Sequence, residues 1–456
     1  MAKKAPKPAS RPDGVGVISR IKLFRRDMFS SQPERLYRAW MAQVRTPFFR
    51  SFLVNDPDLV RRVLSTEAEN FPKSAVLADA LRPLLGESIF ATNAEQWRAQ
   101  RDIIDPAFKG CPRQAFSCMR EAGEAAIERM TDRANGRPVE MESFTSYLVA
   151  DIIFRTLFSV PLPAVTAQSV SKSFREYQKT QPLWSLPALL KLPMWFPRFR
   201  SRASVKHAVT IRSLLVEMVD KRRAEIDAGT APNDLATSLM ATVNPKTDHR
   251  FSKVEMVDQV AIFFLAGHET SASALSWAFY LLAMDQGVQD EVAREAMLLI
   301  TPPQSTDLSK LRFIKDVFNE VLRLYPPVPM FLRDAAKATE LRGVNVPKGS
   351  MVIVSPWHLH RHERLWDNPD EFDPYRWQTE NGKIRRRDAY IPFSTGPRVC
   401  PGAGFGRIEG VLMLAMFLKE FRFEATYKVP VPVAHLTVRA KDGIMLRVFP
   451  RDPDTT

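Results

Sequence analysis

Cysteine is scarce in this chain. Only three cysteines occur among its 456 residues, and no Cys-x-x-Cys pair is present. Three cysteines cannot form a fully paired disulfide framework. Cys111 and Cys118 would lie about two turns apart on a helix, which is too far for one bridge. The cysteine content therefore fits a reducing compartment, and we predict a cytoplasmic protein.

Long apolar runs are also missing. No stretch of about eighteen apolar residues occurs, so we expect no transmembrane helix. The opening residues, Met-Ala-Lys-Lys-Ala-Pro-Lys-Pro, lack the apolar core of a secretory signal. Prolines at positions 6, 8 and 12 disfavour the amphipathic helix of a mitochondrial presequence. We predict a flexible basic tail over residues 1–25 and a single domain over residues 26–456.

Acidic residues are too few to balance the basic ones. The chain has 65 Lys and Arg against 51 Asp and Glu, which gives a net charge of +14. Because the basic residues are spread along the whole sequence, a solvated surface is the first interpretation. An acidic protein partner is the second interpretation, and nucleic acid is a distant third, so we predict no nucleic-acid partner.

Helical patterning dominates the sequence, and neither an internal repeat nor a linker is evident. Helical periodicity covers residues 56–64, 114–134, 204–228 and 254–285. Strand-like runs are short, and the clearest are residues 350–355 and 443–448. We predict a mainly α fold with minor β structure.

One stretch, Phe393-Ser-Thr-Gly-Pro-Arg-Val-Cys-Pro-Gly402, sets a cysteine among turn-forming and basic residues. Gly396 permits a turn with positive φ, and Pro401 suits the first position of a helix. Free amides at a helix start would lower the pKa of the Cys400 thiol. Such a thiolate suits either a nucleophile or a soft metal ligand, whereas a buried structural cysteine is the simpler alternative.

The pattern Phe-x-x-Gly-x-Arg-x-Cys-x-Gly resembles the haem-binding loop of the cytochrome P450 family. The resemblance covers residues from about 56 to 447. It implies the fold of that family, with haem b between a long central helix and the Cys-bearing loop and helix. It also implies that Cys400 binds the haem iron and that Phe393, Arg398 and Gly402 help to hold the cofactor.

The long helix predicted over 254–285 is interrupted at its centre by Ala266-Gly-His-Glu-Thr270. Glycine in a helix costs about 1 kcal/mol relative to alanine, and a close helix crossing is one explanation for Gly267. Alternatively, Ala266 and Thr270 share a face on which small residues admit a flat ligand. The Thr270 hydroxyl can then bond to the carbonyl group four residues back.

This segment is similar to the oxygen-activating helix of cytochromes P450. The resemblance implies that Ala266 and Gly267 border the haem and that Thr270 hydrogen-bonds oxygen at the iron. It further implies that Glu269 relays protons from solvent. His268 needs no role in this scheme.

Trp97 and Arg101 lie four residues apart, so they share a helix face and can bind a carboxylate together. A core tryptophan beside a solvated arginine is the alternative. In the P450 family, a Trp-x-x-x-Arg helix donates to a haem propionate, and Arg333 resembles a second propionate-binding arginine. Together with Arg398, these residues would supply enough donors for two carboxylates.

Glu320 and Arg323 lie three residues apart on a helix that two prolines end. They resemble the buried Glu-x-x-Arg pair of cytochromes P450, which meets a downstream arginine, here Arg376. Tyr375 stands where the family pattern usually has glutamate, and we expect it to change how this loop is held. We interpret the three residues as scaffold rather than as catalytic groups.

Three histidines alternate in His358-Leu-His-Arg-His362, a pattern that invites a metal interpretation. No nearby cysteine or acid completes a zinc set, however. The P450 family often has a His-Arg pair here without a metal, so we predict no second metal site.

Two stretches without motifs, residues 71–89 and 182–199, should shape the substrate pocket. The second is rich in apolar and aromatic residues, including Trp184 and Trp195. A lid packed on the core is the favoured interpretation, and contact with a membrane surface is a further option. Either interpretation predicts a hydrophobic substrate.

No flavin, nicotinamide or iron–sulfur motif is present, so electrons must come from another protein. Arg385-Arg386-Arg387 precedes the Cys400 loop and predicts a docking site for a small acidic ferredoxin, itself served by a reductase. The alternative is a merely solvated run. We predict a monomeric haem-thiolate monooxygenase that uses dioxygen and two external electrons to oxidise a hydrophobic organic substrate.

Two other functions stay open at this point. One is a family member that uses peroxide directly or rearranges an oxygenated substrate. Thr270 and Glu269 argue against it, because such enzymes need no proton relay. The other is a haem-thiolate sensor or electron carrier, which a closed distal side would favour, whereas Gly267 and the variable stretches indicate an open pocket.

Overall fold

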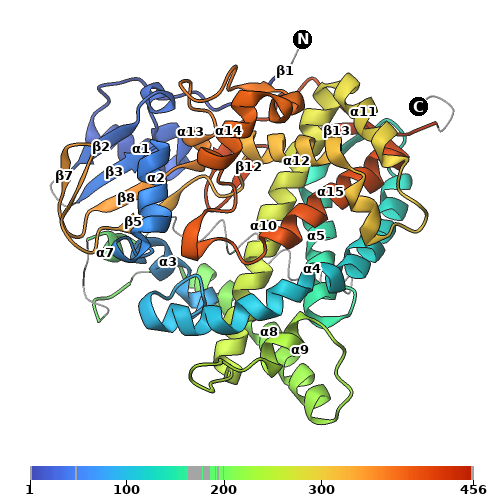
Figure 1. Ribbon diagram of the computed structural model, residues 1–456, viewed down its shortest axis with the longest axis horizontal. Coiled ribbons are helices and arrows are strands. Elements are labelled where there is room, and N and C mark those ends of the chain that lie inside the picture. Colours follow the sequence, from blue (N-terminus) through green and yellow to red (C-terminus); the bar gives the residue numbers. More distant parts are fainter. Residues whose placement is uncertain are drawn as a thin grey trace.

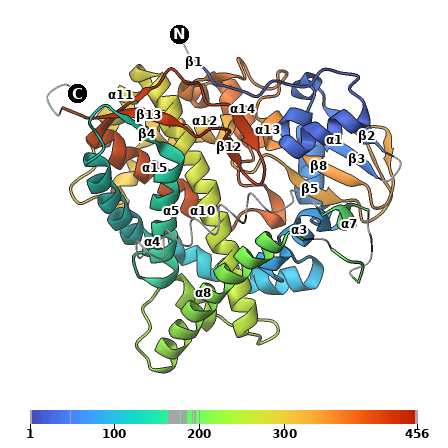
Figure 2. The same cartoon turned by 180° about the vertical axis from the view of Figure 1, so that it is seen from behind.

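The apolar segment predicted as a long helix forms α10 (Lys253–Met284), which runs through the middle of the molecule (Figures 1 and 2). A capping box begins the helix: the Ser252 hydroxyl accepts from the Glu255 N–H at 3.3 Å, and the Glu255 carboxylate accepts from the Ser252 N–H at 2.9 Å. Most residues of α10 are buried on every side, as expected of a core helix.

The computed structural model describes residues 3–46, 49–162, 177, 185–190, 192, 195–198 and 200–452. Besides α10, its helices are α1 (Val17–Arg26), α2 (Pro57–Arg61), α3 (Ala75–Leu85), α4 (Ala94–Thr131), α5 (Met141–Phe158), α7 (Leu186–Leu189), α8 (Arg202–Asp227), α9 (Leu235–Ala241), α11 (Gln286–Ala296), α12 (Arg312–Leu324), α13 (Pro356–Leu359), α14 (Glu380–Asp388) and α15 (Ala403–Glu420). Its strands are β1 (Lys3–Lys4), β2 (Met41–Arg45), β3 (Arg50–Val54), β4 (Pro138–Glu140), β5 (Phe331–Asp334), β6 (Thr339–Leu341), β7 (Val344–Val346), β8 (Met351–Val354), β9 (Glu371–Phe372), β10 (Phe421–Ala425), β11 (Pro432–Ala434), β12 (Val438–Ala440) and β13 (Met445–Pro450).

The helices pack around α10 and bury one large apolar cluster. Helices α5, α8, α12 and α15 all contact α10, while α4 packs on α5 and α15. Glycine permits the closest of these crossings: a Cβ added to Gly267 of α10 would lie 2.6 Å from Ile153 of α5, and one added to Gly410 of α15 would lie 2.1 Å from Phe318 of α12. No helix in the described part of the chain is long and apolar enough to cross a membrane.

The strands form small sheets, and the largest lies on the side of the molecule opposite α5 (Figure 1). Its order is β2-β3-β8-β5, with β3 and β8 parallel and the other neighbours antiparallel. A second apolar cluster is built on this sheet. Three strands, β10-β13-β4, make another sheet, and β11 with β12 forms a hairpin. The predicted mainly α fold with minor β structure is confirmed.

The predicted helices over 204–228 and 254–285 match α8 and α10 closely, but the helix predicted from residue 114 is much longer. α4 has 38 residues and begins at Ala94, so Trp97 and Cys118 belong to one helix. It runs through Pro106 and Pro112, each of which removes a backbone hydrogen bond. Packing of α4 along α5 and α15 holds the helix together where local sequence would break it.

Residues 3–26 differ from the flexible tail predicted over 1–25. β1 pairs with β9, the Tyr325 hydroxyl donates to the Pro6 carbonyl at 2.7 Å, and the Lys7 ammonium lies 2.8 Å from Asp370. α1 follows. A basic, proline-rich composition predicts a flexible segment only when tertiary contacts are left out of account. These three partners lie more than 300 positions away, so local sequence could not reveal them.

Candidate functional site

Backbone geometry closes the Cys400 loop. The Cys400 N–H donates to the Phe393 carbonyl at 3.0 Å. Gly396 has a φ of +73°, which confirms the predicted turn, and a Cβ there would lie 2.3 Å from the Leu64 carbonyl oxygen. Any other residue at this position would therefore disturb the loop. The Phe393 ring also lies 4.8 Å from the Arg407 guanidinium at the start of α15.

The surroundings of the thiol differ from the prediction. α15 begins two residues beyond Pro401, which lies in the turn rather than at the first helical position. Burial raises the pKa of the Cys400 thiol and outweighs the Gly402 N–H bond and the charges of Arg101 and Arg407, which favour the thiolate. Cys400 keeps exposed surface even though much protein surrounds it, so it is accessible to a ligand. A bound cation would supply the stabilisation of the thiolate that the protein alone does not.

Besides Arg407, several basic side chains of the described residues gather beside this loop: Lys73, Arg101, Arg333 and Arg398. Arg101 Nη1 donates to the Val399 carbonyl at 2.8 Å, which ties α4 to the loop. The Arg398 guanidinium lies 5.3 Å from the Trp97 ring, and the Lys73 ammonium lies 5.9 Å from it. The structure thus brings together Trp97, Arg101, Arg333 and Arg398, which the sequence predicted from four separate positions.

Arg101 is paired with Asp105 at 2.6 Å, but the positive charges of Lys73, Arg333 and Arg398 are poorly balanced. Burial, with the charges of Arg333, Arg398 and Arg101, lowers the pKa of Lys73 to about 6, and burial with Arg398 lowers the pKa of Arg333 to about 10. The Nε atoms of Arg333 and Arg398 are buried without a hydrogen-bond partner in the described residues. Since buried donors are normally paired, the cluster fits a ligand that carries two carboxylates.

Lys73 was missed in the sequence analysis. The backbone of Lys73 pairs with that of Arg333 in β5, and the Ser74 N–H donates to the Leu332 carbonyl at 3.1 Å. These contacts bring Lys73 to the cluster. The sequence signal was a lone lysine in the largely apolar stretch 71–89. That signal is weak, because most lysines are simply solvated.

On the central helix, Ala266 is exposed although Leu265 and His268 are buried. The Thr270 hydroxyl donates to the Ala266 carbonyl at 2.7 Å, which is the backbone bond that the sequence predicted. A Cβ on Gly267 would point toward Ile153 of α5, which supports the close helix crossing, and the place of Gly267 beside the haem stays a prediction. Ala266 and Thr270 therefore form the open face of α10.

Glu269 is buried and belongs to a polar network on another side of the helix. Its Oε2 accepts from Arg439 Nε at 3.2 Å and from the Thr437 hydroxyl at 3.4 Å. The neighbouring His268 is bonded to the Ser146 hydroxyl of α5 at 2.7 Å. Arg439 was also missed in the sequence analysis, because it lies 170 positions from Glu269 in a segment without a motif.

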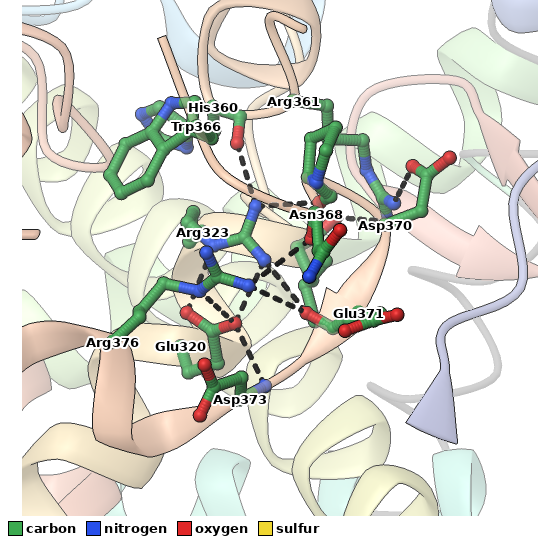
Figure 3. Close-up of polar contacts among 12 residues, drawn as sticks. Glu320, Arg323, His360, Arg361, Trp366, Asn368, Asp370, Glu371, Asp373 and Arg376 are labelled. Carbon is green, nitrogen blue, oxygen red and sulfur yellow. Dashed lines mark hydrogen bonds and ion pairs between the residues drawn. The ribbon is translucent and has the colours of Figure 1, made fainter. Parts of the chain in front are cut away.

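Figure 3 shows Glu320 held between Arg323 and Arg376. Arg323 Nη2 and Arg376 Nε donate to Glu320 Oε1 at 2.8 and 2.9 Å, and Arg323 Nε donates to Oε2 at 2.9 Å. Burial opposes ionisation of Glu320, yet the two guanidinium groups hold its pKa below the usual value. The remaining N–H groups donate to carbonyls of His360, Asp367, Asn368, Pro369 and Glu371. These hydrogen bonds and ion pairs offset the cost of burying the charges, and they hold the loop in place.

Tyr375 takes part in holding the loop. Its side chain is 45% exposed, its hydroxyl donates to Glu291, and its ring lies 5.1 Å from Phe313. The loop is thereby attached to α11 and α12 through a neutral hydroxyl and an aromatic contact. Arg376 completes the buried network without a glutamate at the preceding position.

The three alternating histidines are buried in separate environments. Burial lowers the pKa of His358 and His360 to about 3 and that of His362 to about 4. Their respective neighbours are the Ser355 hydroxyl at 2.8 Å, the Ile391 N–H at 2.9 Å and the Trp40 ring at 4.3 Å. Among the residues that the structure describes, no group of His, Cys, Asp and Glu is arranged to hold a metal ion.

Much of the predicted stretch 182–199 lies outside the described residues, including Trp184. Of the described part, Trp195 is 81% exposed, and Arg198 Nε lies 3.2 Å from Asp79 of α3. The Ser185 hydroxyl donates to the same carboxylate. This part of the stretch is therefore attached to α3, within the other variable stretch, 71–89.

The accessible Cys400 loop lies beside the buried cations of this cluster. The model of the cytochrome P450 family matches residues 26–447, so this chain belongs to that family. Haem is accordingly its cofactor, and the chain is a P450 monooxygenase.

Several bacterial relatives are similar over most of their length. Cyclooctat-9-en-7-ol 5-monooxygenase of Streptomyces melanosporofaciens is 32% identical over 86% of this chain and 83% of its own length. Cyclooctatin synthase of the same organism is 30% identical over 88% and 86%. Pentalenene oxygenase of Streptomyces avermitilis is 30% identical over 87% of each chain. The crystal structure of the cytochrome P450DA heme domain shares the fold, with a TM-score of 0.80 and 23% identity over 100% of this chain and 99% of that one.

Glu409 is a further buried carboxyl at the site. It lies on α15, nine residues after Cys400, and is fully buried. The Ser271 hydroxyl of α10 donates to its Oε2, while its Oε1 has no hydrogen-bond partner in the described residues. Burial raises the pKa of Glu409 to about 8, against the opposing effect of Ser271. A protonated Glu409 therefore links α15 to α10 next to Thr270.

Stability should depend on pH through Glu409. Its folded-state pKa lies above the unfolded value of 4.5, so its contribution is full below about pH 4.5 and is lost as the pH rises through about 8. Glu409→Gln should become more stable relative to wild type over this range, by up to a few kcal/mol. Urea unfolding between about pH 5 and pH 9 measures the difference.

A matched control is Glu128→Gln, which changes an exposed carboxyl on α4. Its free energy of unfolding should follow the wild-type curve at every pH. If the curves of Glu409→Gln and wild type also run parallel, Glu409 is not a protonated carboxyl in the folded protein.

Proposed function

We propose that this protein inserts one oxygen atom of dioxygen into a terpenoid substrate. The balanced reaction is R–H + O2 + 2 e⁻ + 2 H⁺ → R–OH + H2O. The observation that carries the proposal is the open face of α10, formed by Ala266 and Thr270, in a chain that also holds Cys400 beside a cationic cluster. A sensor or electron carrier would need no such open face.

Haem b is the form of the cofactor that we propose. Cys400 would bind the iron, Phe393 and Gly402 would shape the loop around it, and two propionates would be held by Trp97, Lys73, Arg101, Arg333 and Arg398. Bound haem supplies the iron at which dioxygen is reduced. The unpaired Nε atoms of Arg333 and Arg398 support this assignment, because a propionate accepts hydrogen bonds and carries the compensating charge.

Thr270 and Glu269 are the proposed catalytic residues. Because the Thr270 hydroxyl donates to the Ala266 carbonyl, its oxygen can accept a hydrogen bond from water on the open face. Thr270 would hold that water in place, and Glu269 would deliver the protons that the reaction consumes. A peroxide-using enzyme needs neither group, so both favour the dioxygen reaction.

Thr270→Ala tests this part directly. The variant should bind haem and substrate as wild type does, because the side chain is small and partly exposed. Product formed per electron pair should fall severalfold, and hydrogen peroxide should rise to match, since proton delivery is no longer controlled. Thr270→Ser, which keeps the hydroxyl, should restore most of the coupling. Equal coupling in all three proteins would remove Thr270 from the mechanism.

The substrate class is inferred from the relatives. Three are named for cyclooctatin, cyclooctat-9-en-7-ol and pentalenene, which are cyclic terpenoids. The largely apolar surroundings of Ala266 on α10 also suit a hydrocarbon skeleton.

Titration of the ferric holoenzyme with ligands tests the substrate class, because a substrate that displaces water changes the spin state of haem. Cyclic terpene hydrocarbons and alcohols are compared with linear fatty acids of the same carbon number. We expect the spin-state shift and hydroxylated product with the terpenes. A response to the fatty acids alone would overturn the terpenoid class and leave the monooxygenase class intact.

The electron donor that we propose is an acidic ferredoxin with its reductase. Arg386 and Arg387 on α14 are exposed and available, whereas Arg385 is engaged with Asn381 and Asp388. Arg386→Glu with Arg387→Glu should raise the KM for a ferredoxin, most strongly at low salt. Arg223→Glu on α8, far from α14 in Figures 1 and 2, is the control. An unchanged KM in the double variant would move the docking site elsewhere.

We also propose a cytoplasmic monomer with non-covalently bound haem. A scarcity of cysteines supports the reducing compartment. Fractionation of cells, size-exclusion chromatography and extraction of haem with acidified acetone test the three parts separately. Recovery in the membrane fraction, a dimer peak or retained haem would contradict the corresponding part.

A further inference from the structure

The β11–β12 hairpin is fastened to the central helix at the position of Glu269. The Ser273 hydroxyl of α10 donates to the Val438 carbonyl, and the Val438 N–H donates to the Pro327 carbonyl at 3.0 Å. These bonds fix the position of β12 along the axis of α10. They bring the Arg439 side chain onto the Glu269 carboxylate, where both its Nε and its Nη2 donate to Oε2.

Arg439 connects this buried carboxylate to the surface. The side chain of Glu269 is 3% exposed, whereas that of Arg439 is 25% exposed. Burial opposes the charge of Arg439, but the carboxylates of Glu269, Glu142 and Glu140 raise its pKa. The guanidinium is therefore a fixed positive charge between one buried acid and solvent.

Other groups in the described part of the chain also face this pair. From α10, His268 Nδ1 lies 3.5 Å from Glu269 Oε1, and from the turn before β12 the Thr437 hydroxyl lies 3.4 Å from Oε2. From α5, Glu142 accepts the Ala440 N–H at 2.9 Å, and burial raises the pKa of Glu142. Arg439 is thus bonded to the Glu269 carboxylate on α10, and the charge of Glu142 on α5 acts on it from nearby.

We propose that Arg439 is a positioning residue that holds Glu269 ionised and directed toward β12, away from Thr270. Neighbouring residues of an α-helix project about 100° apart, so a carboxylate bound to Arg439 points to a different side from the Thr270 hydroxyl. Proton delivery to Thr270 then requires the ion pair to open. Arg439 keeps its own proton throughout, and its effect is on where the Glu269 carboxylate lies. This inference rests on the proposed role of Glu269 as the proton donor.

Arg439→Gln and Arg439→Lys, both as holoenzymes, test the proposal. Infrared difference spectra at a series of pH values follow the carbonyl band of a protonated Glu269, which Glu269→Gln identifies by removing it. Loss of the adjacent cation should raise the pH midpoint of this band by about one to three units in Arg439→Gln. The pH midpoint of coupling, measured as product formed per electron pair, should move in the same direction. Arg439→Lys, which keeps the charge, should stay close to wild type and remains informative if the glutamine variant folds poorly.

Arg447→Gln is the matched control, because Arg447 forms an exposed ion pair with Glu424 on the neighbouring sheet. It should leave both midpoints unchanged. If Glu269→Gln alters the pH profile of coupling but Arg439→Gln moves neither midpoint, the positioning role of Arg439 is overturned. If Glu269→Gln itself leaves coupling and its pH profile unchanged, the proposed role of Glu269 fails and this inference fails with it.

Discussion

The repulsion among the cations beside the Cys400 loop is the constraint on which the site depends. Lys73 and Arg333 both have lowered pKa values because they are buried among like charges. Desolvation and repulsion of this size amount to several kcal/mol, and the chain offsets them only in part. A dianionic ligand at this place would relieve the strain, so binding of such a ligand and stability of the fold are coupled. The Cys400 thiol also lacks a sufficient stabilising partner within the described part of the protein. Burial raises its pKa, whereas a bound cation would lower it.

The rest of the molecule holds the two faces of this site in place by different means. On the Cys400 side, Glu320 and its two arginines fix a long loop by charge pairs that are fully buried (Figure 3). On the other side, α10 is fixed by apolar packing, with its polar residues bound to α5, α15 and β12. Ala266 and Thr270 are left as the open part. A rigid frame around a small open face is the condition for controlled proton delivery.

Local sequence was enough to predict some of these features. The turn at Gly396, the hydrogen bond of Thr270 and the helix of α10 depend on residues within a few positions of one another, and each was predicted. The Glu320 network could be assigned only through its resemblance to a family pattern, since Arg376 lies 56 positions away. Lys73, Arg439 and the N-terminal segment were missed because their partners are distant and no short motif marks them.

Other differences arose where two local explanations competed. Gly267 could serve a ligand, a helix crossing or both, and the crossing became visible only with the position of Ile153. The pKa of Cys400 depends on how far burial outweighs its amide and arginine neighbours, which sequence does not specify. Pro106 and Pro112 would end α4 on local grounds, and tertiary packing overrides them.

Cys400 and the cationic cluster should together form one haem-thiolate site. The absorption spectrum of the reduced, carbon-monoxide-bound protein tests it most directly. We expect a Soret band shifted strongly to the red, as thiolate ligation requires, and its loss in Cys400→Ser. A band typical of histidine-ligated haem, or a red-shifted band that survives in Cys400→Ser, would contradict it.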